Sequence, residues 1–198
     1  MLLFAALTLA PVLRADPGTN ITLAALPSYV DRLFVPVVPR AANTVDIAAL
    51  RAESIVETPK NFDVRIVNGN VVVYSDGGDA SGYAKVRAGG RELTLTLMNV
   101  VPYDRMQNGS LEGYRVGEYN PAPLKGLEQY ERPKGFIRLG SANANLWVSD
   151  HYRLRDFQCK LDGATKFIVL RTDALLKLEI LQNELATTRG LQFDRVNR

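Results

Sequence analysis

The stretch FDVRIVNGNVVVY, residues 62–74, decides the fold class of this chain. In its first half, Phe62, Val64 and Ile66 alternate with side chains of the opposite face, a period of two that is typical of a strand with one buried face. The pair Asn68-Gly69 favours the positive φ angles of a tight hairpin turn. The valines and the tyrosine at 71–74 are good strand formers. The stretch therefore predicts a β-hairpin.

The same pattern continues to residue 101. Gly82 to Arg87 predicts a third strand, and Gly89-Gly90 predicts another turn. Between residues 93 and 98, three leucines at odd positions alternate with Thr94, Thr96 and Met98. We predict a small antiparallel β-sheet or sandwich module over residues 60–102. Because a helix is predicted downstream, the predicted fold class is α+β.

The segments on either side of this module are less regular. Residues 16–59 are interrupted by prolines that include Pro27, Pro36, Pro39 and Pro59. This predicts an irregular N-terminal arm whose most helical piece runs from Asp46 to Glu53. Residues 103–148 are rich in Pro, Gly and Tyr and predict a connector. We expect this connector to pack over its neighbours through the rings of Tyr114, Tyr119 and Tyr130.

Residues 149–198 change character again. Ser149 to Cys159 predicts a short helical turn, and residues 168–170 predict an extended run. A helix is expected from Thr172, whose hydroxyl can cap free backbone N–H groups, and Gly190 provides a left-handed stop. The predicted apolar stripe of this helix consists of Leu175, Leu178, Leu181, Gln182 and Leu185, and it is widened by Leu176 and Ile180.

Composition and charge exclude several classes of protein. The 198 residues are 46% hydrophobic and 23% charged, which is ordinary for a globular chain. The formal charge of +3, without clustered basic residues, is too small for a nucleic-acid partner. Weak attraction to an anionic cell-wall polymer stays open. The chain has one Cys and one His, which excludes an internal disulfide and any site built from two histidines.

The first residues indicate export. Met1 to Leu13 form an apolar run, which predicts a signal peptide over residues 1–15 that is cleaved before Asp16, although no basic residue precedes the run. The run is shorter than the ~20 residues that a membrane-spanning helix needs. An apolar N-terminal helix or strand is the alternative. We expect a periplasmic or cell-envelope location, with the membrane involved only through this segment.

His151 and Cys159 are the first candidates for chemistry. A metal site of His151 with two carboxylates is conceivable, but no spacing supports it. Cys159 could act as a nucleophile with His151 as its base, yet the apolar neighbours Phe157 and Leu161 favour a buried thiol. The favoured interpretation of His151 is a capping or surface residue.

The other candidates are weaker still. Asp76-Gly77-Gly78-Asp79 could offer carboxylates to a cation, but Gly and Asp are also what a plain turn requires. Glu128 and Glu131 could form an acid/base pair, although nothing in the sequence separates their pKa values. Ser110 lacks the Gly-x-Ser-x-Gly setting of a nucleophile elbow. We therefore assign no catalytic, cofactor-binding or metal residue from the sequence.

One stretch resembles a known family. Residues 151–160 read HYRLRDFQCK and are followed by IVLR at 168–171 and LLKLE at 175–179. This resembles the entry to the catalytic domain of bacterial D-Ala-D-Ala carboxypeptidase-type zinc peptidases, which opens with an aromatic-x-Leu-x-x-Phe-x-Cys segment and continues into a leucine-rich helix. GSLEGYRVGEY at 109–119 and RPKGFI at 132–137 are similar to segments that precede that domain. The resemblance covers roughly residues 95–190.

The resemblance implies an exported enzyme that trims the stem peptides of peptidoglycan with a zinc-bound water as nucleophile. In that family a Ser-Gly-x-Arg segment, a His and an Asp that bind zinc, a Glu base and a second His ligand all follow the leucine helix. None of them matches a residue here. The expectation is thus an incomplete start of a peptidase domain over 149–198, inactive alone, with zinc only in a full-length protein.

Two other functions stay open at this point. The chain could be a non-catalytic module that binds the cell wall or a protein through its β region. It could also be an enzyme complete within these residues that uses His151 and Cys159. The oligomeric state is not indicated by the sequence.

Overall fold

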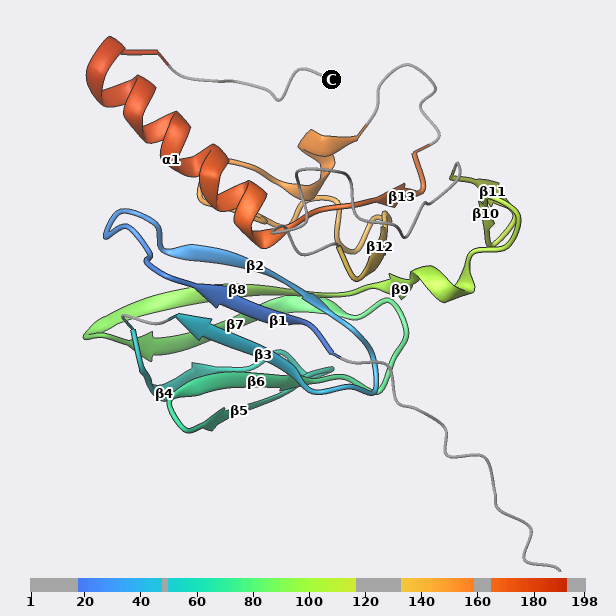
Figure 1. Cartoon of the computed structure of the whole chain (residues 1–198), viewed down its shortest axis with the longest axis horizontal. Coiled ribbons are helices and arrows are strands. Elements are labelled where there is room, and N and C mark those ends of the chain that lie inside the picture. Colours follow the sequence, from blue (N-terminus) through green and yellow to red (C-terminus); the bar gives the residue numbers. More distant parts are fainter. Residues whose placement is uncertain (1–17, 48–49, 117–132, 159–164, 192–198) are drawn as a thin grey trace, which may run out of the picture.

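The computed structural model of the chain describes residues 18–47, 50–116, 133–158 and 165–191. Two four-stranded sheets face each other, and the C-terminal elements lie over the outer face of one of them (Figure 1). The first sheet has the order β1 (Asn20–Leu23), β3 (Asn43–Ile47), β6 (Asn70–Tyr74) and β5 (Asp63–Val67). The second has the order β2 (Arg32–Val37), β8 (Arg91–Asn99), β7 (Ser81–Ala88) and β4 (Ala52–Glu57). The α+β fold class is confirmed, and the β module is a sandwich.

Both predicted turns of the module are present. β5 and β6 pair antiparallel across Asn68 and Gly69, whose φ angles are 55° and 84°. β7 and β8 pair across Gly89 and Gly90, at φ angles of 57° and 76°. These left-handed conformations strain most L side chains, which explains why Gly and Asn occupy the turns.

The prediction of an irregular N-terminal arm over residues 16–59 is wrong. The described residues of this segment form strands β1 to β4, and the helix expected from Asp46 to Glu53 is absent from them. β3 shows the alternating burial of a half-buried strand. β4 pairs antiparallel with β7 at the edge of the second sheet. Strand pairing with distant residues has therefore overridden the local helix propensity of this segment.

Each sheet also contains one parallel pair. β1 lies parallel to β3, and β2 lies parallel to β8 along six register positions from Arg32–Thr94 to Val37–Asn99. The module is thus mixed rather than purely antiparallel. The hairpins that the sequence predicted fall in different sheets, β5–β6 in the first and β7–β8 in the second.

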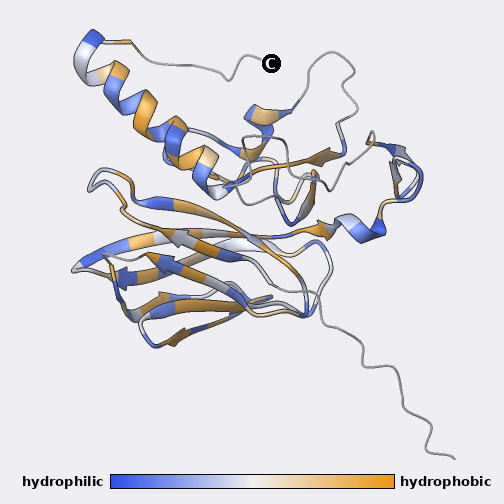
Figure 2. Cartoon of the chain, in the orientation of Figure 1, coloured by the Kyte–Doolittle hydropathy of each residue, from blue (hydrophilic) through white to orange (hydrophobic). Residues whose placement is uncertain are grey.

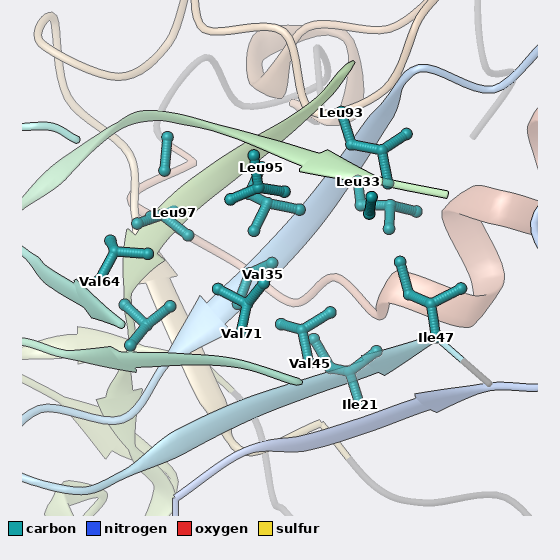
Figure 3. Packing of buried hydrophobic residues seen from close by; sticks show 14 of the residues in the cluster. Ile21, Leu33, Val35, Val45, Ile47, Val64, Val71, Leu93, Leu95 and Leu97 are labelled. Atoms are coloured by element: carbon teal, nitrogen blue, oxygen red, sulfur yellow. The ribbon is translucent and has the colours of Figure 1, made fainter. Parts of the chain in front are cut away.

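The sandwich core follows the period of two along the strands. Leu93, Leu95 and Leu97 of β8 point between the sheets and are at most 1% exposed. Figure 3 shows them facing Val45 and Val71 of the opposite sheet. In Figure 2 hydrophobic and hydrophilic residues are mixed along the strands of the sandwich and along α1, as expected for elements that bury one face. Burial of these apolar side chains is the main source of stability for the sandwich.

A second core lies on the outer face of the β2–β8 sheet. Phe34 and Met98, which alternate with the sandwich residues, pack there against C-terminal residues that include Tyr152, Leu154 and Leu175. The elements of this layer are β9 (Val101–Pro102), η1 (Tyr103–Arg105), β10 (Ser110–Leu111), β11 (Tyr114–Arg115), β12 (Gly135–Arg138), η2 (Leu154–Phe157), β13 (Phe167–Ile168) and α1 (Thr172–Arg189). The strands β13, β12 and β9 form one small sheet.

This layer contains residues from two segments that were predicted to be separate, 103–148 and 149–198. β12 comes from the expected connector 103–148, and its partner β13 comes from 149–198. Aromatic rings do pack within it, since Phe136 makes edge contacts with Tyr103 and Phe167. Tyr114 also contacts Phe167. Tyr119 and Tyr130 lie outside the described residues, as do residues 1–15.

Helix α1 starts and ends as predicted, but two details differ. Gly190 closes it in the left-handed conformation at a φ of 64°. The Thr172 hydroxyl caps no N–H group and instead donates to the carbonyl of Phe34 at 2.8 Å. The buried face consists of Thr172, Leu175, Leu176, Glu179 and Gln182, whereas Leu181 is 48% exposed. The burial of Glu179 is explained below by its partner.

Among the described residues, the structure contains no helix with the length and apolar character needed to cross a membrane.

Candidate functional site

His151 lies in a turn that is attached to the middle of α1. Its backbone N–H donates to Glu179 Oε1 at 2.9 Å, and its Nδ1 lies 2.5 Å from Glu179 Oε2. The Glu179 side chain is 3% exposed and the His151 side chain is 53% exposed. The Glu179 carboxylate thus contacts both the backbone and the ring of His151. The pair therefore fastens the turn to the helix and fixes the orientation of an imidazole that is half open to solvent.

Nε2 of His151 has no hydrogen-bond partner among the described residues. A carboxylate that holds one imidazole nitrogen commonly orients the other toward a metal or a proton donor. Within the described ranges, however, no three His, Cys, Asp or Glu side chains are grouped so that they could hold a metal ion. The contacts of His151 with Glu179 therefore indicate a structural role, in which His151 holds the turn against α1.

Asp150 lies beside this pair and joins it to the start of β2. Its Oδ2 accepts a hydrogen bond from the Asp31 backbone N–H at 3.0 Å. Burial raises the pKa of the Asp150 carboxyl, and the nearby charge of Glu179 raises it further, whereas the bond from Asp31 and the charge of Arg32 act in the opposite direction. Burial also raises the pKa of Tyr152, again with a contribution from Glu179. Negative charge is thus crowded at the seam between the sandwich and the C-terminal layer.

Replacing Asp150 with Asn should stabilise the protein at neutral pH, on the order of 0.5 kcal/mol. A carboxyl whose pKa is raised by folding binds its proton more tightly in the folded state, so its ionisation above that pKa lowers the free energy of unfolding. The amide keeps an acceptor for the Asp31 N–H and removes the charge. Urea titrations between neutral and acidic pH should show the gain shrinking as the pH falls through the folded pKa, because the wild-type carboxyl is then protonated.

Asp173 is the matched control, because folding lowers the pKa of its carboxyl whereas it raises that of Asp150. Burial opposes its ionisation, but the two hydrogen bonds from Arg171, at 2.8 and 2.7 Å, outweigh burial and lower its pKa. Its stabilising effect is present above the unfolded pKa and is lost as the pH falls through the folded pKa. Asp173→Asn should therefore destabilise the protein at neutral pH. Equal losses for both variants would contradict this account of Asp150.

The loop that contains Asp76 and Asp79, which was the candidate cation site, lines a groove. The loops at 60–63 and 75–80, together with the end of β6, enclose an open groove of about 770 Å³. Gly77 and Gly78 have φ angles of 131° and 73°, as expected for a turn. Asp79 is ion-paired with Arg138, which also binds Glu112. Asp76 lines the groove without a partner among the described residues.

The remaining sequence candidates do not form a site. Ser110 belongs to the two-stranded hairpin of β10 and β11, where it pairs with Arg115. Cys159, Glu128 and Glu131 lie outside the described residues, so a pairing of Cys159 with His151 is not tested. The burial of Glu179 is not predicted from the sequence, although its position four residues after Leu175 places both on one helix face.

Comparison of the chain with protein-family models, curated proteins and solved structures finds no match.

Proposed function

We propose that the chain is the N-terminal portion of an exported zinc D-Ala-D-Ala carboxypeptidase-like peptidase that acts on the stem peptides of peptidoglycan. In this proposal the described residues provide the scaffold on which the peptidase domain begins. In this proposal the zinc is held by other residues of the full-length protein, since the described ones contain no group of three potential ligands. No catalytic step is therefore assigned to the described side chains.

The observation that supports the proposal is where the residues of the resemblance lie. Tyr152 and Leu154 are buried in the second core, and Phe157 packs against it. The rings of Tyr152 and Phe157 lie 5.9 Å apart. Leu175, from the leucine-rich helix, belongs to the same cluster. The spacing aromatic-x-Leu-x-x-Phe thus places side chains that pack the turn, η2 and α1 together.

The outer side of α1 also suits this proposal. Ile180 and Leu181 are 40% and 48% exposed, and Leu191 beyond the helix is 54% exposed. A contiguous exposed apolar surface can mark a face that another part of a protein covers. The proposed peptidase domain would cover this face with its zinc-bearing part.

The test compares the 198-residue chain with the protein extended through the downstream reading frame. We expect stoichiometric zinc and release of the terminal D-Ala from a stem pentapeptide only in the extended protein, because the described residues offer no metal site. Metal analysis and detection of released D-Ala give the two readouts. A His151→Ala variant of the extended protein is the control and should keep its zinc. Zinc in neither protein, or in the 198-residue chain itself, would contradict the proposal.

A non-catalytic cell-wall-binding module is the second candidate, and the groove at the end of the sandwich favours it. Binding to purified peptidoglycan no stronger than that of a control protein of equal charge would contradict this alternative. The two candidates are compatible if the sandwich binds the wall and the peptidase domain acts on it.

A further inference from the structure

The groove at the end of the sandwich has the size of a ligand site. It is formed by two segments that meet only in the folded chain, residues 60–63, which lead into the start of β5, and residues 75–80 after β6. Its volume is about 770 Å³. Small-molecule sites commonly occupy about 300–1,000 Å³. An oligosaccharide of a few rings fits within this range.

The loop at residues 75–80, which lines the groove, is held in place by hydrogen bonds from Asn99. The Asn99 side chain is 7% exposed, and its Nδ2 donates to Ser75 Oγ at 2.8 Å and to the carbonyls of Gly77 and Gly78 at 3.0 and 3.1 Å. These bonds tie the 75–80 loop to the end of β8. A loop that is ordered before binding loses less conformational entropy when a ligand arrives.

The mouth of the groove is open at its two glycines. A Cβ built on Gly77 or Gly78 would meet no atom within 4 Å. Crowding therefore does not explain the glycines, whereas their positive φ angles do. The absence of side chains here leaves the loop backbone accessible to a ligand.

The side chains that line the groove combine hydrogen-bonding groups with one aromatic ring. Lys60, Asn61 and Asp76 make no hydrogen bond or ion pair among the described residues. Tyr74 is 39% exposed, and the guanidinium of Arg65 lies 5.8 Å from its ring centroid. A sugar ring presents both an apolar C–H face and a rim of hydroxyl groups. An amphipathic tyrosine beside unpaired amide, ammonium and carboxylate groups matches both features.

The charges favour an uncharged ligand. Asp63 is ion-paired with Arg65, and Asp79 is ion-paired with Arg138. Lys60 and Asp76 remain as one unpaired charge of each sign. Because neither sign dominates, the groove offers no strong field for a phosphate polymer or a nucleic acid. Its carboxylates also form no group that could hold a metal ion within the described ranges.

We infer that this groove binds a neutral saccharide, and specifically the N-acetylated glycan chain of the cell wall. The choice of glycan rests on the proposed function, whereas the saccharide class rests on the groove itself. Bound glycan would keep the protein on the wall while the proposed peptidase domain acts on stem peptides attached to the same chain.

The test titrates the 198-residue chain with a soluble β-1,4-linked N-acetylglucosamine oligosaccharide in isothermal calorimetry and by NMR chemical shifts. We expect saturable binding with a Kd on the order of 1 mM or tighter. Asp76→Ala combined with Tyr74→Ala should weaken binding at least about tenfold, which corresponds to about 1.4 kcal/mol. Both side chains are on the surface, and Lys60→Glu provides a second variant in the groove that should also weaken binding.

Matched controls lie away from the groove. Tyr29 is 45% exposed in the loop between β1 and β2, and Asp104 is exposed in η1. Tyr29→Ala combined with Asp104→Ala should bind within about twofold of the wild type. No binding by the wild type, or equal binding by the groove variants, would overturn the inference. If the extended protein releases D-Ala but does not bind glycan, the saccharide inference is wrong and the proposed peptidase function is not affected. If the protein binds glycan but holds no zinc and releases no D-Ala, the saccharide inference is supported and the proposed peptidase function is wrong.

Discussion

Replacing Asn43 with Asp should lower the free energy of unfolding by about 3–5 kcal/mol. Asn43 is fully buried at the start of β3. Its Oδ1 accepts from the backbone N–H groups of Thr19 and Val38, at 2.9 and 2.8 Å. Its Nδ2 donates to the carbonyls of Val38, Ala41 and Val73, at 3.0, 2.9 and 3.2 Å. One side chain thus connects the ends of both sheets.

Aspartate has the same shape but replaces the donor with an oxygen that faces three carbonyl oxygens. It also places a charge where no water can reach it, so the loss includes unsatisfied backbone groups and a buried ionisable side chain. Urea unfolding followed by far-ultraviolet circular dichroism measures the change. Asn20→Asp, on an exposed position of β1, is the matched control and should change stability by less than about 0.5 kcal/mol. Similar midpoints for the two variants would contradict the role of Asn43.

Replacing Leu154 with Ala should cost about 2–5 kcal/mol of stability in the second core. Leu154 is fully buried in η2, within the cluster that contains Tyr152 and Leu175. Its removal leaves a cavity that the surrounding side chains can fill only in part. The control is Leu181→Ala on the exposed side of α1, for which we expect a change of at most about 0.5 kcal/mol.

The single tryptophan of the chain reports on this core separately. The backbone N–H of Trp147 donates to the Tyr83 hydroxyl, its carbonyl accepts from Thr96, and the guanidinium of Arg153 lies 4.4 Å from its ring. In Leu154→Ala, the fluorescence transition should therefore occur at lower urea than the circular dichroism of the sandwich. Coincident transitions, with a midpoint equal to that of Leu181→Ala, would show that Leu154 does not hold this layer on the sheet.

Local signals in the sequence account for the elements that were predicted correctly. Asn68-Gly69 and Gly89-Gly90 specify their turns because few other residues adopt positive φ angles without strain. The alternation over residues 93–98 specifies a strand because successive side chains point to opposite faces. Gly190 ends α1 for the same conformational reason as the turns. Each of these signals spans only a few residues.

The helix expected from Asp46 to Glu53 shows where local reasoning fails. Ile47 is buried by the opposite sheet, and Ala52 pairs with Ala88 in a strand that lies thirty-six positions further along the chain. Pairing at such separations decides between helix and strand, and no short window of sequence contains it. The division of the two predicted hairpins between different sheets has the same cause.

The candidate site depends even more on tertiary structure. The sequence by itself determined the strand-forming hairpins, the ends of the C-terminal helix and the scarcity of His and Cys, because these are properties of single residues or of short repeats. Only the tertiary structure decided that Glu179 is buried against His151 and that Asn61 and Asp76 line one groove. Long-range packing, which buries a polar side chain only where a partner satisfies it, provides the physical reason.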